Sequence, residues 1–229
     1  MKKKFILAGI FLALFLLLIV AVKTVDVADI GPMGTSIGLS HINAGVHKAL
    51  GVSELWYNVT EVLGVLALAV AALFALIGLI QLIKRKSILR IDAEILSVGC
   101  LYIAMAAAYV LFEVIVVNYR CIIMPGATEP EASFPSSHTM LVCVVLTSAV
   151  ILASKYIKCH GIRLPLQIIG CLAVLVTVVG RLLSGVHWLT DIIGGVLISA
   201  ALVTAFTALT ELFKSKLLAN ETNEEMENS

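Results

Sequence analysis

The chain has 229 residues, of which 60% are hydrophobic and 14% are charged, and its formal net charge is +1. A soluble globular domain is about 45–50% apolar and about 25% charged, so this composition indicates a protein that is solvated mainly by lipid. The near-zero net charge argues against a nucleic-acid partner, and the length suits one helical bundle rather than two domains.

Six apolar runs are long enough to cross a membrane as helices. A helix needs about 20 apolar residues to span a hydrocarbon core of about 30 Å. Since no run alternates with period two, helices are the only spanning structure that satisfies the backbone. The predicted spans cover about residues 5–22, 57–83, 93–117, 138–157, 164–182 and 189–213. The sequence therefore predicts an all-α polytopic membrane protein, a bundle of six transmembrane helices.

The two ends of the chain differ in character. The first run follows three lysines like a signal peptide, but it is longer than a usual signal and has no small-x-small cleavage site before Lys23. We expect it to be kept as the first span. Residues 1–216 are predicted to form one six-span domain, and the acidic residues 217–229 a disordered cytoplasmic tail.

Basic residues predict how the chain is oriented. They lie in alternate connections, which by the positive-inside rule face the cytoplasm. They are Lys2–Lys4, Lys84–Lys86 with Arg90, Lys155 with Lys158 and Arg163, and Lys214 with Lys216. Both termini are then cytoplasmic, and the connections 23–56, 118–137 and 183–188 face outward. The small size and lack of targeting signals favour a bacterial plasma membrane.

The outer segment 23–56 contains His47 and Trp56, residue types that suit an interfacial amphipathic helix. It is interpreted as a plain connection, with a lid or substrate gate as the alternative. The five cysteines are scattered and lack metal-ligand or C-x-x-C spacing, so they are interpreted as small hydrophobic residues of the helices.

The sequence Phe134–His138, FPSSH, opens the fourth predicted span. Ser136 follows a proline and precedes an apolar run, as expected of a helix N-cap. Helix N-termini attract anions, so the Ser136 hydroxyl and the N–H groups around Ser137 and His138 suit phosphoryl oxygens. Capping alone would explain Ser136 equally well.

Two arginines lie at the same predicted membrane face. Arg120 follows the third span, and Arg181 closes the fifth with Asp191 as its nearest acid. A charge at the membrane boundary is costly, and the planar guanidinium fork fits phosphate oxygens. Snorkelling of either arginine to lipid headgroups is the alternative.

His187 precedes Asp191 by four residues, one helical turn. A carboxylate that accepts from one ring nitrogen makes the other a better nucleophile, so His187 is the candidate nucleophile. His138 suits proton donation to the leaving group. The alternatives are a structural hydrogen bond, or a zinc site in which His138 is a third ligand. The preferred interpretation requires no metal and no cofactor.

These two groups of residues resemble the motifs of a known family, the type 2 phosphatidic acid phosphatase (PAP2) superfamily. The segment FPSSHT is similar to its P-S-G-H motif. Arg181, His187 and Asp191 have the spacing of its S-R-x5-H-x3-D motif.

The chain departs from the family motifs at several positions. In the first motif, K-x6-R-P, Arg120 matches the arginine, but Cys121 replaces the proline and Glu113 stands at the lysine position. Gly180 replaces the serine that begins the third motif, and Ser137 replaces the glycine of the second. Glu113 is expected to pair with Arg120 or Arg181 and so modulate the site; altered chemistry is the alternative.

The resemblance implies a lipid phosphatase. His187 would become a phosphohistidine, Asp191 would support it, and His138 would protonate the leaving group. Phosphate would be held by Arg120, Ser136, Ser137 and Arg181. The expected substrate is a lipid phosphate or diphosphate in the surrounding membrane, with undecaprenyl diphosphate first and phosphatidylglycerol phosphate or phosphatidic acid next. A non-catalytic lipid-phosphate binding or transport protein and a lipid phosphotransferase are the alternatives; no oligomeric state is predicted.

Overall fold

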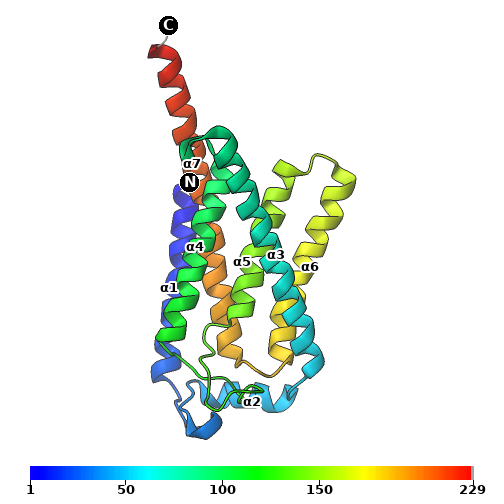
Figure 1. Cartoon of the computed structure of the whole chain (residues 1–229). Helices are drawn as coiled ribbons and strands as arrows, with labels where there is room; N and C mark the ends of the chain where they lie inside the picture. Colours follow the sequence, from blue (N-terminus) through cyan, green and yellow to red (C-terminus); the bar gives the residue numbers. More distant parts are fainter. Residues whose placement is uncertain (228–229) are drawn as a thin grey trace.

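Long apolar helices account for most of the chain in the computed structural model, which describes the backbone of residues 1–227 and the side chains of 1–88 and 90–216. The elements are α1 (Lys2–Thr24), η1 (Pro32–Gly34), α2 (Ser40–Leu50), α3 (Glu54–Arg85), η2 (Ile88–Arg90), α4 (Ala93–Val114), α5 (Ser137–Tyr156), α6 (His160–Leu183) and α7 (Leu189–Glu227) (Figure 1).

All six predicted spans are confirmed as helices. The helices α1, α3, α4, α5, α6 and the first part of α7, Leu189–Lys216, are long and apolar enough to cross a membrane. The protein is therefore an integral membrane protein. Helix α7 continues past residue 216, but the side chains of residues 217–229 lie outside the described part of the chain. The disordered tail expected there therefore stays a prediction.

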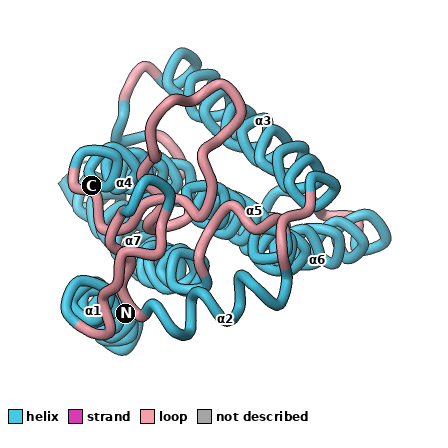
Figure 2. Tube along the Cα trace, turned by 90° about the horizontal axis from the view of Figure 1, so that it is seen from below, coloured by secondary structure: helices cyan, strands magenta, loops and turns pink. Residues whose placement is uncertain are grey.

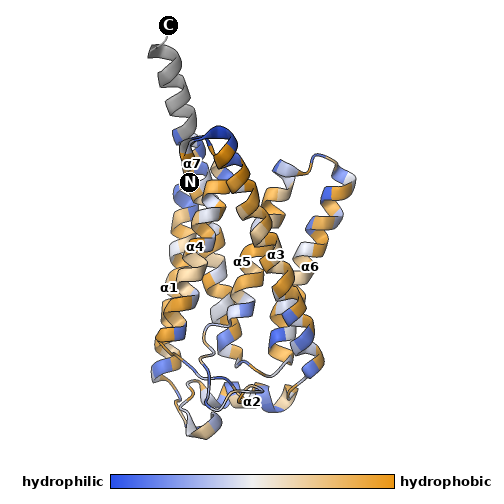
Figure 3. Ribbon diagram, in the orientation of Figure 1, coloured by the Kyte–Doolittle hydropathy of each residue, from blue (hydrophilic) through white to orange (hydrophobic). Residues whose placement is uncertain are grey.

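Helix α5 is the central helix of the bundle. It packs against α3, α4, α6 and α7, whereas α1 packs mainly on α7 (Figure 2). Half of the most apolar stretch of α5 is buried inside the protein, against 17% for α1, α3 and α6. The ribbons of these helices are hydrophobic along most of their length (Figure 3). The apolar side chains that they leave exposed are suited to lipid.

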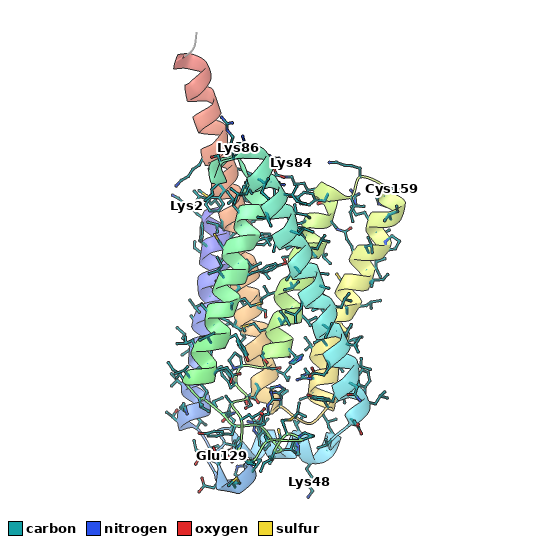
Figure 4. The ribbon with its side chains drawn as sticks, in the orientation of Figure 1. Lys2, Lys48, Lys84, Lys86, Glu129 and Cys159 are labelled. Atoms are coloured by element: carbon teal, nitrogen blue, oxygen red, sulfur yellow. The ribbon has the colours of Figure 1, made fainter. Side chains whose placement is uncertain are left out.

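The two ends of the bundle carry different groups. Lys2, Lys84 and Lys86 lie together at the end where the N-terminus and the last turns of α7 are found (Figure 4). There the buried carboxylate of Glu94 is paired with Lys155 and with Lys214, which ties α4 to α5 and α7. The basic connections thus gather at one end, as the predicted topology requires.

Helix α2 lies across the opposite end of the bundle (Figure 1). Its His47 has Nε2 3.1 Å from the carbonyl oxygen of Gly185, and its ring lies 5.5 Å from that of Trp188. A helix is present in this segment and contains His47, but Trp56 does not belong to it, because α3 begins earlier than expected, at Glu54.

The segment 23–56 is also more than a plain connection. The buried side chain of Asn43 donates to the hydroxyl of Thr190 at 3.0 Å and accepts from the backbone N–H of Thr190 at 3.2 Å. That N–H belongs to the first turn of α7, where helical backbone donors need an outside acceptor. Asn43 therefore caps α7 from a helix about 147 positions earlier in the chain.

Candidate active site

A backbone hydrogen bond joins the starts of α5 and α7 at the end of the bundle that α2 covers. The backbone N–H of Ser136 donates to the carbonyl oxygen of Asp191 at 3.0 Å. A Cβ on Gly195 would lie 3.0 Å from Thr139 and 3.1 Å from the carbonyl oxygen of Ser136, so a glycine permits this close crossing. Two sequence motifs 50 residues apart are thereby brought together.

Ser136 is the N-cap of α5, as predicted from the sequence. Its buried hydroxyl accepts from the N–H of Thr139 at 3.4 Å and from the hydroxyl of that residue at 3.0 Å. Ser137, by contrast, is half-buried and lines the cavities described below. The Ser137 side chain, rather than the Ser136 hydroxyl, is thus the one that faces open space.

Phe134 anchors the FPSSH segment in the core. Its ring is stacked on Phe15 at 5.7 Å and lies 6.2 Å from Phe112. A Cβ on Gly194 of α7 would come within 2.6 Å of this ring, so glycine is needed there. The aromatic cluster joins α1, α4 and α7 around the segment and so fixes the start of α5.

His187 is almost fully buried in the turn between α6 and α7. Its Nδ1 lies 3.6 Å from Oδ2 of Asp191, and neither ring nitrogen has a hydrogen-bond partner among the described groups. Burial lowers the pKa of His187 well below its usual range, and the positive charges of Arg120 and Arg181 lower it further. The ring is therefore neutral, with a nitrogen lone pair free to react.

Asp191 is held in place by two donors. Its Oδ2 accepts from the N–H of Trp188 at 3.0 Å, and its Oδ1 accepts from the side chain of Asn118 at 3.4 Å. Asn118 is buried in the loop after α4. Sequence reasoning missed it, since a lone asparagine in a loop carries no signal of its own.

Arg181, at the end of α6, is 1% exposed, and its guanidinium group donates hydrogen bonds to three side chains. Nη1 donates to the Thr60 hydroxyl and to Oε1 of Glu61, each at 3.0 Å, and Nη2 donates to Nδ1 of His138 at 3.1 Å. The guanidinium also stacks over Tyr57 at 5.2 Å. Arg181 is therefore bound inside the protein and does not extend to headgroups.

His138 lies against α3. Its Nε2 is 3.1 Å from Oε1 of Glu61, and a Cβ on Gly64 would come within 2.9 Å of the ring. Glu61 was missed in the sequence, although a signal existed: it is an acid inside a predicted span, and such residues are usually functional. Its distance of 120 positions from Arg181 concealed the pairing.

Arg120 and Glu113 do not form the expected pair. Arg120 has its Nε 3.0 Å from Oε2 of Glu131, and Arg181 is paired with Glu61. Among the side chains that the structure describes, neither arginine forms an ion pair with Glu113, so that prediction was wrong. The reason is that nearer acids are available, one on the same loop and one on α3.

Two adjoining cavities connect these residues. One has a volume of about 440 Å³ and is lined by apolar side chains of α3, α4 and α5 together with Glu61, Ser137 and His138. The other, of about 10 Å³, is lined in part by Glu113 and His187. Tyr109, Ser137 and Met140 line both cavities. The two histidines thus border two cavities that share these three lining residues.

The polar groups around this region suit an anion. Among the described side chains, Nη1 of Arg120, Nε of Arg181 and both nitrogens of His187 are buried without a hydrogen-bond partner. Leaving buried guanidinium donors unpaired costs free energy, so the two arginines are arranged for a ligand rich in acceptor oxygens. Within the same described part of the chain, no three His, Cys, Asp or Glu residues are grouped as metal ligands.

A comparison with known protein families finds a match to the family that the sequence motifs resemble. Residues 116–214 match the sequence pattern of the PAP2 superfamily, and this segment contains the starts of both α5 and α7. This match agrees with the resemblance that the two motifs indicated.

The fold of the whole chain is similar to that of a solved membrane protein, the transmembrane PAP2-type phosphatidylglycerolphosphate phosphatase of Bacillus subtilis. The TM-score is 0.62 with 19% sequence identity, over 90% of this chain and 96% of that one. Among curated proteins, no match to the sequence was found. The likeness shows the fold, including the spans that precede the matched segment.

Proposed function

We propose that the protein is a membrane phosphatase that hydrolyses a lipid phosphate or diphosphate. Undecaprenyl diphosphate is the leading candidate substrate, followed by phosphatidylglycerol phosphate and phosphatidic acid. The observation that carries the proposal is the buried, neutral and unpartnered imidazole of His187 beside two arginines. A nucleophile without a proton, surrounded by fixed cationic donors, suits attack on a phosphorus atom.

The reaction has two steps. In the first, Nε2 of His187 attacks phosphorus, and the bond from phosphorus to the lipid oxygen breaks while His138, in its protonated imidazolium form, gives a proton to that oxygen. Asp191, on the Nδ1 side of His187, stabilises the positive charge that develops on the ring. In the second, a water molecule gives up a proton to His138 and attacks the phosphohistidine, which releases phosphate and restores His187. Arg120, Arg181 and the N-terminus of α5 stabilise the phosphoryl oxygens, and no metal or cofactor takes part.

The larger cavity suits the apolar part of such a substrate. It lies beside His138 and Glu61 and is otherwise lined largely by residues such as Val65, Leu68 and Met105. A phosphate headgroup at His187 would then leave its hydrocarbon chain among α3, α4 and α5. With both termini in the cytoplasm, as the basic residues predict, the site opens to the outer leaflet of a bacterial plasma membrane.

A panel of lipid phosphates tests this function. Purified protein in detergent is expected to release inorganic phosphate from at least one of the three candidate lipids, and EDTA is expected to leave the rate unchanged. Loss of activity that added Zn²⁺ restores would contradict the metal-free mechanism. Binding of lipid phosphate without release would favour a transport protein, and phosphate passed to a second lipid would identify a phosphotransferase.

The pH profile of kcat/KM tests the state of His187. Since burial and then the nearby arginines lower its pKa, the ring stays neutral as the pH falls through about 6.5, the ordinary value for histidine. Activity is lost only when the pH falls through the lowered pKa. Arg120→Gln removes one of the charges that lower the pKa, so the acid limb of its profile should move to higher pH. An acid limb at the same pH in both proteins would contradict the assignment.

A further inference from the structure

Glu61 occupies a distinctive position in the candidate site. A single carboxylate oxygen, Oε1, lies 3.0 Å from Nη1 of Arg181 and 3.1 Å from Nε2 of His138. In the proposed function, these two groups hold a phosphoryl oxygen and protonate the leaving group. The acid therefore occupies the place that a substrate oxygen would need.

The hydrogen bonds around His138 determine where its proton lies. Arginine has donors only, so Nδ1 of His138, which is 3.1 Å from Nη2 of Arg181, must accept. The proton of the neutral ring is then on Nε2, and it is directed at Glu61. Arg181 on one side and Glu61 on the other thus set the tautomer of His138 in the ligand-free site.

The cation of the site is buried, whereas the acid is partly exposed. Arg181 is 1% exposed, and it keeps its bond to Thr60 and its stacking on Tyr57 whether or not Glu61 is in place. The side chain of Glu61 is 36% exposed and borders the larger cavity. Gly64, on the next turn of α3, leaves room for the ring of His138.

Resting on the proposed function, we propose that Glu61 is the resident anion of the phosphate site. Before substrate binds, it pairs with Arg181 and holds the proton of His138 on Nε2. The incoming phosphate displaces the carboxylate and takes over both donors. Glu61 is thus a positioning residue that fixes the tautomer of His138 while the site is empty, and its charge competes with the phosphate, which keeps anions without a lipid chain from occupying the site tightly.

Binding of inorganic phosphate to purified protein in detergent, measured by calorimetry, tests the competition. Glu61→Gln keeps the shape and an acceptor oxygen but removes the charge, so it is expected to bind phosphate at least about fivefold more tightly than the wild type. Glu54→Gln, the same change at an exposed position on α3, is the control and should match the wild type. Equal or weaker binding by Glu61→Gln would overturn the inference.

The same measurement separates this inference from the proposed function. If phosphate binds equally to the wild type and to Glu61→Gln, the proposed phosphate site is supported and only the proposed role of Glu61 is wrong. If no form binds phosphate, the phosphate site itself is wrong and the inference falls with it.

Nitrogen-15 NMR of labelled histidines provides a second readout, with His138 assigned by the loss of its signals in His138→Ala. A proton on Nδ1 of His138 in the ligand-free protein would also overturn the inference.

Discussion

Replacing His187 with asparagine is expected to lower phosphate release from lipid phosphates by at least about a thousandfold, because the variant lacks the imidazole that is proposed to attack phosphorus. Asparagine is smaller and neutral, and it leaves Asp191 with its donors Trp188 and Asn118. The loss should therefore be chemical rather than structural. Release of phosphate from the substrate panel measures it, together with an acid-labile phosphoenzyme that forms only in the wild type.

The matched control for this change is His160→Asn at the start of α6. His160 is exposed, and its neighbour Cys159 lies at the end of the bundle opposite α2 (Figure 4), so this variant should keep the wild-type rate and phosphoenzyme. The melting temperature of each variant in detergent shows whether the fold is kept. A folded His187→Asn protein that still releases phosphate at an ordinary rate would rule out His187 as the nucleophile.

Arg181→Lys is expected to lower the rate by at least about a hundredfold, although the positive charge is kept. The guanidinium fork reaches Thr60, Glu61 and His138 at once, from a position that is 1% exposed. A lysine ammonium is a compact point charge and cannot hold all three partners in these directions. The change should also lower the free energy of unfolding by about 2 kcal/mol, because buried polar groups lose their partners.

The control for Arg181 is Arg163→Lys, the same substitution near the other end of α6. It should leave both the rate and the melting temperature unchanged. The rates of phosphate release and thermal unfolding in detergent measure the two effects separately. An Arg181→Lys protein with the wild-type rate would show that only the charge matters and that the fork geometry of the site has no function.

The apolar runs and the two motifs could be predicted from the sequence because their signals are local. Each span is a continuous stretch of residues that must satisfy its own backbone in lipid, so the six helices follow from composition and length. Ser136 as the cap of α5 follows from the residues next to it. The spacing of His187 and Asp191 is likewise contained within one helical turn.

The partners of the charged groups could not be predicted in this way. Glu113 was the expected partner because it stands at a family position, yet the ion pairs go to Glu131 and Glu61. Asn43 and Asn118 contact the first turn of α7 from distant parts of the chain. Such pairings depend on which side chains the packed helices bring within about 3 Å, the range of a hydrogen bond.

The sequence by itself determined that this is a six-span membrane protein, and it predicted histidines, arginines and an acid at the same end of the helices. Each of those properties is set by neighbouring residues and by the solvent that surrounds the chain. Only the tertiary structure decided that α3 contributes Glu61 to the site and the surface on which His138 packs, and that Asn43 of α2 caps α7. Those contacts join residues more than 70 positions apart, and they exist because α3 packs against α5 and α6 and α2 lies against α7.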